Sequence, residues 1–298
     1  MHNLYSIFVR FHDICKKFSY GLVNDNGNIP RVGVIPRFSD LEVVALALAA
    51  EASSIDSENS LFHKLQEYSG SLPNLISRRQ FNDRRKRLSE LCEVIRKRIA
   101  GHIDGGENTF CIDSKPVAVC RMARSKRCKI GTEYSTAPDV GYCASQNTYY
   151  YGYKLHAVCG LSGVVHSYDM TKASVHDIKY LNDVKYDFSN CSIIGDRGYI
   201  SKHVQLNLFE EAKISLEVPC RSNQRDYKPM FMPFATARKR IETVFSQLDD
   251  QFMMTRNYAK RSDGVFTRIK GKIGAFTFLQ YINYINHRPI GQVKYALY

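Results

Sequence analysis

The chain has 298 residues, of which 44% are hydrophobic and 24% charged, so it is long enough for one or two folded domains and is not intrinsically disordered. Its formal net charge of +13 favours a polyanionic partner, nucleic acid before a membrane. No apolar run approaches the roughly 18 residues of a membrane-spanning helix, so we expect no membrane contact. The nine cysteines form no C-x-x-C pair, which fits a reducing cytoplasm better than a disulfide framework.

The N-terminal hundred residues carry helical patterns. Apolar residues recur at helical spacing over residues 1–20. Ser39 followed by Glu42 three positions later is a capping box, which predicts a helix over residues 40–52. A shorter helix is expected over residues 61–68. These helices are interpreted as packing elements.

A second capping box, Ser77 with Gln80, opens a basic helical segment. We expect one helix whose apolar stripe is Phe81, Leu88, Leu91 and Val94. The basic residues around that stripe are Arg78, Arg79, Arg84, Arg85, Lys86, Arg87, Arg96, Lys97 and Arg98. A solvated basic face is the plain interpretation, but in a protein this basic we favour a helix that contacts DNA phosphates.

Residues 101–108 are rich in glycine and polar residues and predict a domain boundary. Before it we expect an all-helical, basic, DNA-binding domain over residues 1–105. After it the pattern changes to short strands, which predicts an α/β domain over residues 106–298.

The first strand, residues 110–113, brings Asp113 to its carboxyl end, where open α/β sheets place their ligands. An aspartate that only caps a turn is the alternative. Residues 116–146 look irregular, with a basic cluster over residues 121–129 that either touches DNA or is simply solvated. Strands are then predicted over residues 149–159 and 164–170, joined by a tight turn.

Lys154 and His156 share one face of the second strand, because strand side chains alternate, and either could contact substrate. A short helix is predicted over residues 174–182. The apolar strand over residues 192–194 delivers a second aspartate, Asp196, between glycines that allow a tight turn. A helix over 201–212 and a strand over 214–218 follow.

The third carboxylate lies on a helix predicted over residues 235–252. Its apolar stripe is Ile241, Val244, Phe245, Leu248 and Phe252, and Glu242 adjoins this stripe. Arg238 lies four residues earlier, able to pair with Glu242 or to reach a phosphate. Considered alone, Glu242 would be interpreted as a solvated surface residue. A final helix over residues 266–285 is expected to pack against the catalytic body.

Taken together, Asp113, Asp196 and Glu242 predict a divalent-metal site. Mg²⁺ is a hard cation that takes oxygen ligands, and a pair of ions can activate an attacking oxygen and stabilise a leaving one. Without a cation, three converging carboxylates would repel each other, and at least one would have a raised pKa. A purely structural role for such a cluster is therefore disfavoured.

Residues 109–290 resemble the catalytic domain of DDE-type transposases from bacterial insertion sequences, which have an RNase H-like fold: a mixed sheet with flanking helices. The local sequences that carry the resemblance are Ile112-Asp113-Ser114, Tyr151-Gly152-Tyr153-Lys154-Leu155-His156, Ala173-Ser174-Val175-His176-Asp177, Gly195-Asp196-Arg197-Gly198-Tyr199 and Arg238-Lys239-Arg240-Ile241-Glu242-Thr243-Val244-Phe245. Helical N-terminal domains are also usual in this family.

The resemblance implies that Asp113, Asp196 and Glu242 hold two Mg²⁺ ions, for which Mn²⁺ could substitute. Water would cut at the end of the element, and the exposed 3′-hydroxyl would then attack target DNA. The implied partners are the terminal inverted repeats and target DNA, both double-stranded, with the protein assembled on DNA as a homodimer or larger. The implied location is the bacterial cytoplasm, with the nucleoid.

One departure concerns the glutamate helix, where Ala235 and Asp249 occupy places that often hold Tyr and Lys in relatives. Lys154, Arg197 or Arg240 could take over contact with the transposon end. The full set of expected DNA contacts is Arg78, Arg79, Arg84, Arg85, Lys154, His156, Arg197, Arg238 and Arg240. Asp177 is a rival for the second carboxylate, although its position at a helix start also suits a cap.

Two other functions remain open at this point. One is a nuclease on the same fold that cuts without recognising element ends. The other is a catalytically inactive relative that keeps its basic helices for DNA binding.

Overall fold

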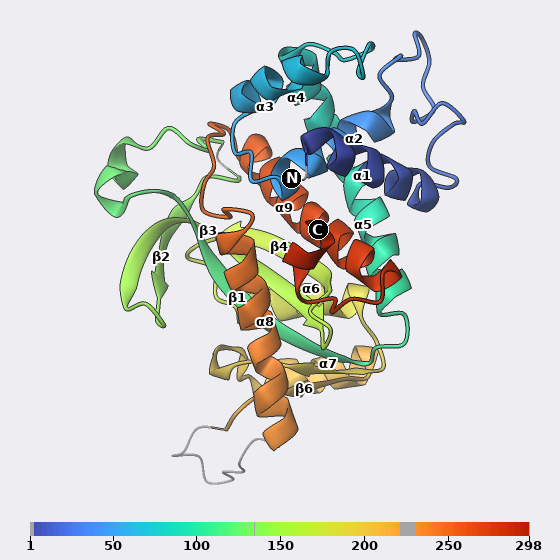
Figure 1. Ribbon diagram of the computed structural model, residues 1–298. Helices are drawn as coiled ribbons and strands as arrows, with labels where there is room; N and C mark the ends of the chain where they lie inside the picture. Colours follow the sequence, from blue (N-terminus) through green and yellow to red (C-terminus); the bar gives the residue numbers. More distant parts are fainter. Residues whose placement is uncertain (1–2, 134, 221–230, 298) are drawn as a thin grey trace. The chain divides into compact units, whose positions relative to one another are not determined.

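The computed structural model describes residues 3–133, 135–220 and 231–297 (Figure 1). The chain divides into two compact units, one comprising residues 1–103 and 248–298 and the other residues 104–247. The first unit therefore takes in a C-terminal stretch that the sequence analysis had assigned to the α/β domain. The assignment of DNA binding to one domain and catalysis to the other stays a prediction.

The first unit is helical, with its elements drawn from both ends of the chain. They are α1 (Leu4–Phe18), α2 (Asp40–Ala52), α3 (Glu58–Leu65), η1 (Gln66–Tyr68), α4 (Arg78–Arg87), α5 (Ser89–Ile103), α9 (Ser262–Ile285) and η4 (Val293–Leu297). Both predicted capping boxes are present, at the start of α2 and of α4. In each, the cap serine accepts a hydrogen bond from the third helical residue, whose side chain accepts one in return.

The predicted single basic helix is two helices. α4 ends at Arg87, and the backbone of its C-cap residue Leu88 (φ −92°, ψ 8°) leaves the helical region before α5 begins. Leu88 and Leu91 are buried, but Val94, placed on the same predicted stripe, is 39% exposed because the break changes the helical phase.

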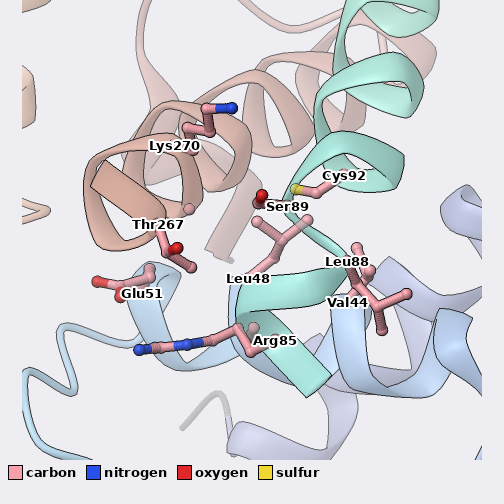
Figure 2. Close-up of a pocket in the computed structure, with 11 residues that line it drawn as sticks. Val44, Leu48, Glu51, Arg85, Leu88, Ser89, Cys92, Thr267 and Lys270 are labelled. Atoms are coloured by element: carbon pink, nitrogen blue, oxygen red, sulfur yellow. The ribbon is translucent and has the colours of Figure 1, made fainter. Parts of the chain in front are cut away.

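Helix α9 packs against α2 and α5 within the helical unit, whereas the sequence analysis expected it to pack against the catalytic body. α2 is buried along all of its length except Glu42, which explains its near-continuous apolar sequence. α2, α4, α5 and α9 meet around a cavity of about 20 Å³ lined by residues that include Leu48, Cys92 and Thr267 (Figure 2). A cavity of this size leaves the core closely packed.

The second unit is built on one six-stranded sheet. Its strands are β1 (Thr109–Cys120), β2 (Asp139–Cys143), β3 (Thr148–Gly160), β4 (Val165–Lys172), β5 (Cys191–Ile194) and β6 (Ile214–Glu217). The order is β2-β3-β1-β5-β6, and β4 also pairs with β3. The β3 pairings are antiparallel, whereas β1, β5 and β6 run parallel. The predicted fold class, a mixed α/β sheet with flanking helices preceded by a helical region, is confirmed.

The sheet of this unit has helices on both faces. On one face α6 (Ile178–Asp187) and α7 (Lys202–Ala212) pack on the buried side chains of β1, β5 and β6, with Ile112 and Ile193 among them. On the other face lies α8 (Met232–Asp250), where Cys111 of β1 donates its thiol hydrogen to the carbonyl oxygen of Ala237 at 3.3 Å (Figure 1). Short 3₁₀ turns, η2 (Met122–Arg127) and η3 (Arg197–Tyr199), complete the unit.

Several predicted bounds in this unit need correction. β1 continues far beyond Asp113, to Cys120, because Val117 is buried opposite Tyr153 and keeps the ladder with β3 intact. β2 lies inside the stretch predicted to be irregular. The helix expected from residue 174 begins at Ile178.

Candidate active site

Asp113 and Asp196 are brought together by the parallel pairing of β1 and β5. The last paired residues are Cys111 and Ile194, so each aspartate lies two residues beyond the end of the shared ladder. Asp113 is thus in the middle of a long strand, not at its end as predicted, but it is at the end of the parallel part. The register of the parallel pair therefore brings the two aspartates near each other, which the end of the strand was expected to do.

The carboxyl group of Asp113 is held in surroundings that disfavour its charge. Burial, together with the nearby carboxylates of Asp196 and Asp177, raises the pKa of Asp113 to about 7. The backbone N–H of Ser114, which donates to Asp113 Oδ1 at 2.8 Å, and the charge of Arg238 act in the opposite direction. A buried carboxyl beside other carboxylates, with too little positive charge around it, is the setting that a bound cation would stabilise.

Asp196 is fixed by the turn that follows it. Its Oδ1 accepts a hydrogen bond from the backbone N–H of Gly198 at 2.7 Å, and it caps η3. A Cβ atom at Gly198 would lie 2.8 Å from that same oxygen, so only glycine fits here without displacing the carboxylate. The glycines around Asp196 were predicted to allow a tight turn. Gly198 also leaves space for the Asp196 carboxylate and donates a hydrogen bond to it.

Tyr199 is a neighbour of the aspartates that the sequence analysis did not single out. It is fully buried, and its hydroxyl group has no hydrogen-bond partner among the described residues. Burial and the charges of Asp177, Asp113 and Asp196 raise its pKa well above the ordinary value. Its position directly after Gly198 was the only available signal, since a tyrosine in a turn has many possible roles.

Asp177 lies near the other two aspartates, since a Cβ atom at Gly198 would be 3.6 Å from its Oδ2, but it already has partners within the protein. Its Oδ1 accepts hydrogen bonds from Lys154 Nζ at 2.8 Å and from Ser114 Oγ at 3.1 Å. Ser114 follows Asp113 directly, so its side chain leaves the strand on the other side, away from the face that Cys111 presents to α8. Asp177 is therefore already paired with a cation of the protein, whereas Asp113 shares its face with α8.

Glu242 is presented by α8 but does not complete a three-carboxylate cluster. Its half-exposed side chain forms an ion pair with Arg238 at 3.2 Å, one helical turn earlier. Within the described ranges, no three His, Cys, Asp or Glu side chains are arranged to hold a metal ion. Asp113 and Asp196 offer the oxygen donors that a hard divalent cation needs, and Glu242 is engaged by Arg238.

The predicted DNA contacts differ widely in accessibility. Arg197 and Arg240 are exposed in the α/β unit, as are Arg78 and Arg79 in the helical unit. Arg84 and Arg85 have mostly buried side chains paired with Asp40 and Glu58, at 2.6 and 2.7 Å, and so already have carboxylate partners.

His156 has no exposed surface with which to contact DNA. It is fully buried, lies within 2.9 Å of the Thr171 hydroxyl and stacks on Tyr180. Burial lowers its pKa to about 4, so the imidazole is neutral. The imidazole therefore lies within the core, with its Nδ1 4.0 Å from Asp177 Oδ1, and Lys154 on the same strand forms an ion pair with Asp177.

The sheet order, with aspartates just beyond the parallel pairing of two adjacent strands and helices on both faces, is that of an RNase H-like α/β domain. A family model described as transposase DDE domain matches residues 104–278, more than half of the chain. The chain belongs to this family of DDE transposases, metal-dependent enzymes that cut and join DNA in transposition. A search of curated proteins gave no match. In the described part of the chain, no helix is both long enough and apolar enough to cross a membrane.

Proposed function

We propose that this transposase cuts the ends of its own DNA element and joins the 3′-hydroxyl to target DNA, using Asp113, Asp196 and Glu242 to hold two divalent cations. The observation that supports the proposal best is the register of β1 and β5, because Asp113 and Asp196 each follow the last pair of this parallel ladder by two residues. The raised pKa of Asp113 also supports the proposal, because the positive charge of a bound cation would stabilise the ionised form of this carboxyl group.

The donor set suits Mg²⁺, with Mn²⁺ as a substitute, since all three side chains offer carboxylate oxygens. When bound, such ions would activate the attacking oxygen and stabilise the leaving one. The chain's own contribution is to aim the carboxylates: the N–H of Ser114 orients Asp113, and the N–H of Gly198 orients Asp196.

Arg238 has a second part in this proposal. It forms an ion pair with Glu242 and also lowers the pKa of Asp113, so it supplies positive charge to the face of the sheet where the cations would bind. We infer that Glu242 joins the aspartates when Arg238 turns to a DNA phosphate, which its guanidinium can bind through two hydrogen bonds. Arg197 and Arg240, both exposed, would contact the same DNA.

The helical unit would hold the DNA, and two copies would meet on it, because joining two element ends normally requires two active sites. Mg²⁺ as the cation, recognition of ends and assembly as a homodimer are parts of the proposal that go beyond membership of the family.

The test uses a labelled duplex that carries the ends of the DNA element flanking this gene. Wild-type protein and Asp196→Asn are each incubated with it, with Mg²⁺ and with chelator. Metal-dependent cuts at the element boundary that the variant does not make, while it still binds the duplex, are the expected result. Cuts scattered along the duplex would instead indicate a nuclease without end specificity. Unimpaired cutting by Asp196→Asn would overturn the assignment of the site.

A further inference from the structure

The helical unit contains a large open cavity that runs along α4, from Arg78 to Lys86. Its volume is about 860 Å³, and it is lined by the first turn of α3, by α4, and by the segment that leads into α9. The cationic side chains that line it are Arg78, Arg85, Lys86, Lys260, Arg261 and Arg268. The acidic residues of the lining are Asp56 and Glu58, so positive charge is in excess.

Two of these cations are not used by the protein itself. Arg78 of α4 and Lys260 of the segment that leads into α9 are exposed, and neither side chain has an ion-pair or hydrogen-bond partner among the described residues. By contrast, Arg85 is paired with Glu58 at 2.7 Å, and Lys86 lies 3.5 Å from Asp263. The two unpaired cations are far apart in the sequence but line the same cavity.

Buried polar atoms at the cavity also lack partners. The Nε atoms of Arg85 and Arg268 are buried and have no hydrogen-bond partner in the part of the chain that the structure describes, although both arginines line the cavity. The Arg268 side chain is only 6% exposed and is anchored through another nitrogen to Glu51 at 3.1 Å. A donor that is buried without a partner carries a free-energy cost, which an acceptor entering the cavity would relieve.

The backbone adds to the positive potential. α3 and α9 both begin at the cavity, and within the described ranges the N-cap residue of neither helix forms a capping hydrogen bond, although Glu58 and Asp263 lie in their first turns and Asp263 Oδ1 accepts a hydrogen bond from the N–H of Gly264. Helix N-termini carry partial positive charge and favour phosphate groups. This effect is secondary to the six cationic side chains, but it has the same sign.

We propose that this cavity, the α3–α4–α9 groove, binds the sugar–phosphate backbone of double-stranded DNA. Its cations are spread over two walls and a volume much larger than one phosphate group, which fits several successive phosphates better than a single small anion. Tyr258, 67% exposed and lying in the same lining, offers a flat ring to a sugar. The inference rests on the proposed function and locates part of its DNA contact.

The groove also changes which residues are expected to touch DNA. Of the N-terminal arginines predicted from sequence, Arg78 and Arg85 line it, whereas Arg84 does not. Six of the fourteen residues that line the groove belong to residues 258–268, which follow the catalytic unit in the chain. The DNA-binding surface of the helical unit is thus composite and could not be assigned from the basic N-terminal run alone.

The test measures how binding of a duplex of unrelated sequence depends on salt. Arg78→Ala, Lys260→Ala and the double variant are compared with wild type, and Lys64→Ala serves as the matched control. Lys64 is an exposed lysine of α3 that lies outside the groove and has no partner among the described residues. Because Arg78 and Lys260 are exposed and unpaired, their truncation leaves folding intact, which a thermal melt verifies.

Removing one cation that neutralises a phosphate reduces the slope of log K against log salt by about 0.9. We therefore expect a reduction of about 0.9 for each single groove variant, about twice that for the double variant, and none for Lys64→Ala. Groove variants with the wild-type slope would overturn the inference.

The metal-dependent cleavage assay keeps this test separate from the proposed function. If wild type cuts element ends and the groove variants retain the full slope, the groove assignment fails alone. If the slopes fall as expected but wild type does not cut, the groove stands and the transposase site fails.

Discussion

At the scale of single residues, the candidate site depends on backbone N–H groups as much as on its carboxylates. Ser114 and Gly198 each donate a main-chain hydrogen bond to an aspartate, at 2.8 and 2.7 Å, and these bonds fix where the carboxylates lie. Such contacts are local, so the one or two residues after each aspartate decide the geometry. A substitution that preserves every carboxylate can therefore still damage the site.

Gly198→Ala tests this dependence. The new Cβ would meet Asp196 Oδ1 at 2.8 Å, closer than atoms tolerate, so the carboxylate has to move. We expect DNA cleavage to fall by about 100-fold, the effect of a displacement of about 1 Å in a catalytic group. Cleavage rates on element-end duplexes provide the measurement. Gly106→Ala, which places its Cβ in open space in the same unit, should cleave at the wild-type rate. Equal rates for both variants would show that Asp196 is not held as described.

His156 gives a prediction about pH. Burial lowers its folded-state pKa to about 4 from the ordinary 6.5, so between these values the unfolded chain binds a proton that the folded protein does not. This contribution to stability is fully present above pH 6.5 and is lost as pH falls toward 4, amounting to about 3 kcal/mol. Urea unfolding of wild type and His156→Gln at several pH values isolates it. The variant should show a smaller loss of stability on acidification, and identical pH profiles would contradict a neutral buried imidazole.

At the scale of elements, the sequence indicated the local signals well and the long-range ones poorly. Both capping boxes and the turn between β3 and β4 were predictable, because each depends on a few neighbouring residues. The length of β1 was not, since Pro116 and the polar residues beside it resemble a loop until β3 is seen pairing alongside. The engagement of Glu242 by Arg238 was foreseen as one possibility, but side-chain choice between two partners depends on tertiary surroundings.

The packing of α2 against α9 shows the same limit. Glu51, Lys272 and Arg268 look like surface charges in sequence, yet Lys272 Nζ lies 2.9 Å from Glu51 Oε2 in the core and also donates to the carbonyl oxygen of Phe252. Burial lowers the pKa of Lys272, and the charge of Glu51 opposes that shift. The pair therefore joins two helices distant in sequence through a contact that is buried in the core.

Lys272→Met removes one partner of this buried pair. Glu51 would keep only Arg268 as a cationic partner among the described residues, so we expect the free energy of unfolding to fall by about 3 kcal/mol, the lower end for a broken buried pair. Urea denaturation followed by circular dichroism measures it. The control is Lys294→Met, at an exposed lysine, which should leave the transition in place. An unchanged transition in Lys272→Met would mean that the pair adds nothing to the stability of the helical unit.

At the scale of the whole molecule, the basic residues behind the net charge of +13 divide into two groups by use. Some form ion pairs within the protein, as Arg84 and Arg85 show, and others such as Arg78 and Lys260 remain available. The composition could predict a polyanionic partner, but it could not predict which basic side chains would contact that partner. That residues 248–298 belong to the helical unit could likewise not be predicted from the sequence, because it depends on tertiary packing and not on a local pattern.

We propose that Asp113, Asp196 and Glu242, and not Asp177, hold the catalytic cations. The most direct measurement is calorimetric titration of Mn²⁺ into wild type, Asp113→Asn, Asp196→Asn, Glu242→Gln and Asp177→Asn, each bound to a duplex carrying an element end. We predict that the first three variants lose at least one binding event while Asp177→Asn retains the wild-type stoichiometry, because Asp177 is already paired with Lys154. Loss of metal binding in Asp177→Asn together with full binding in Glu242→Gln would contradict this assignment of the metal ligands.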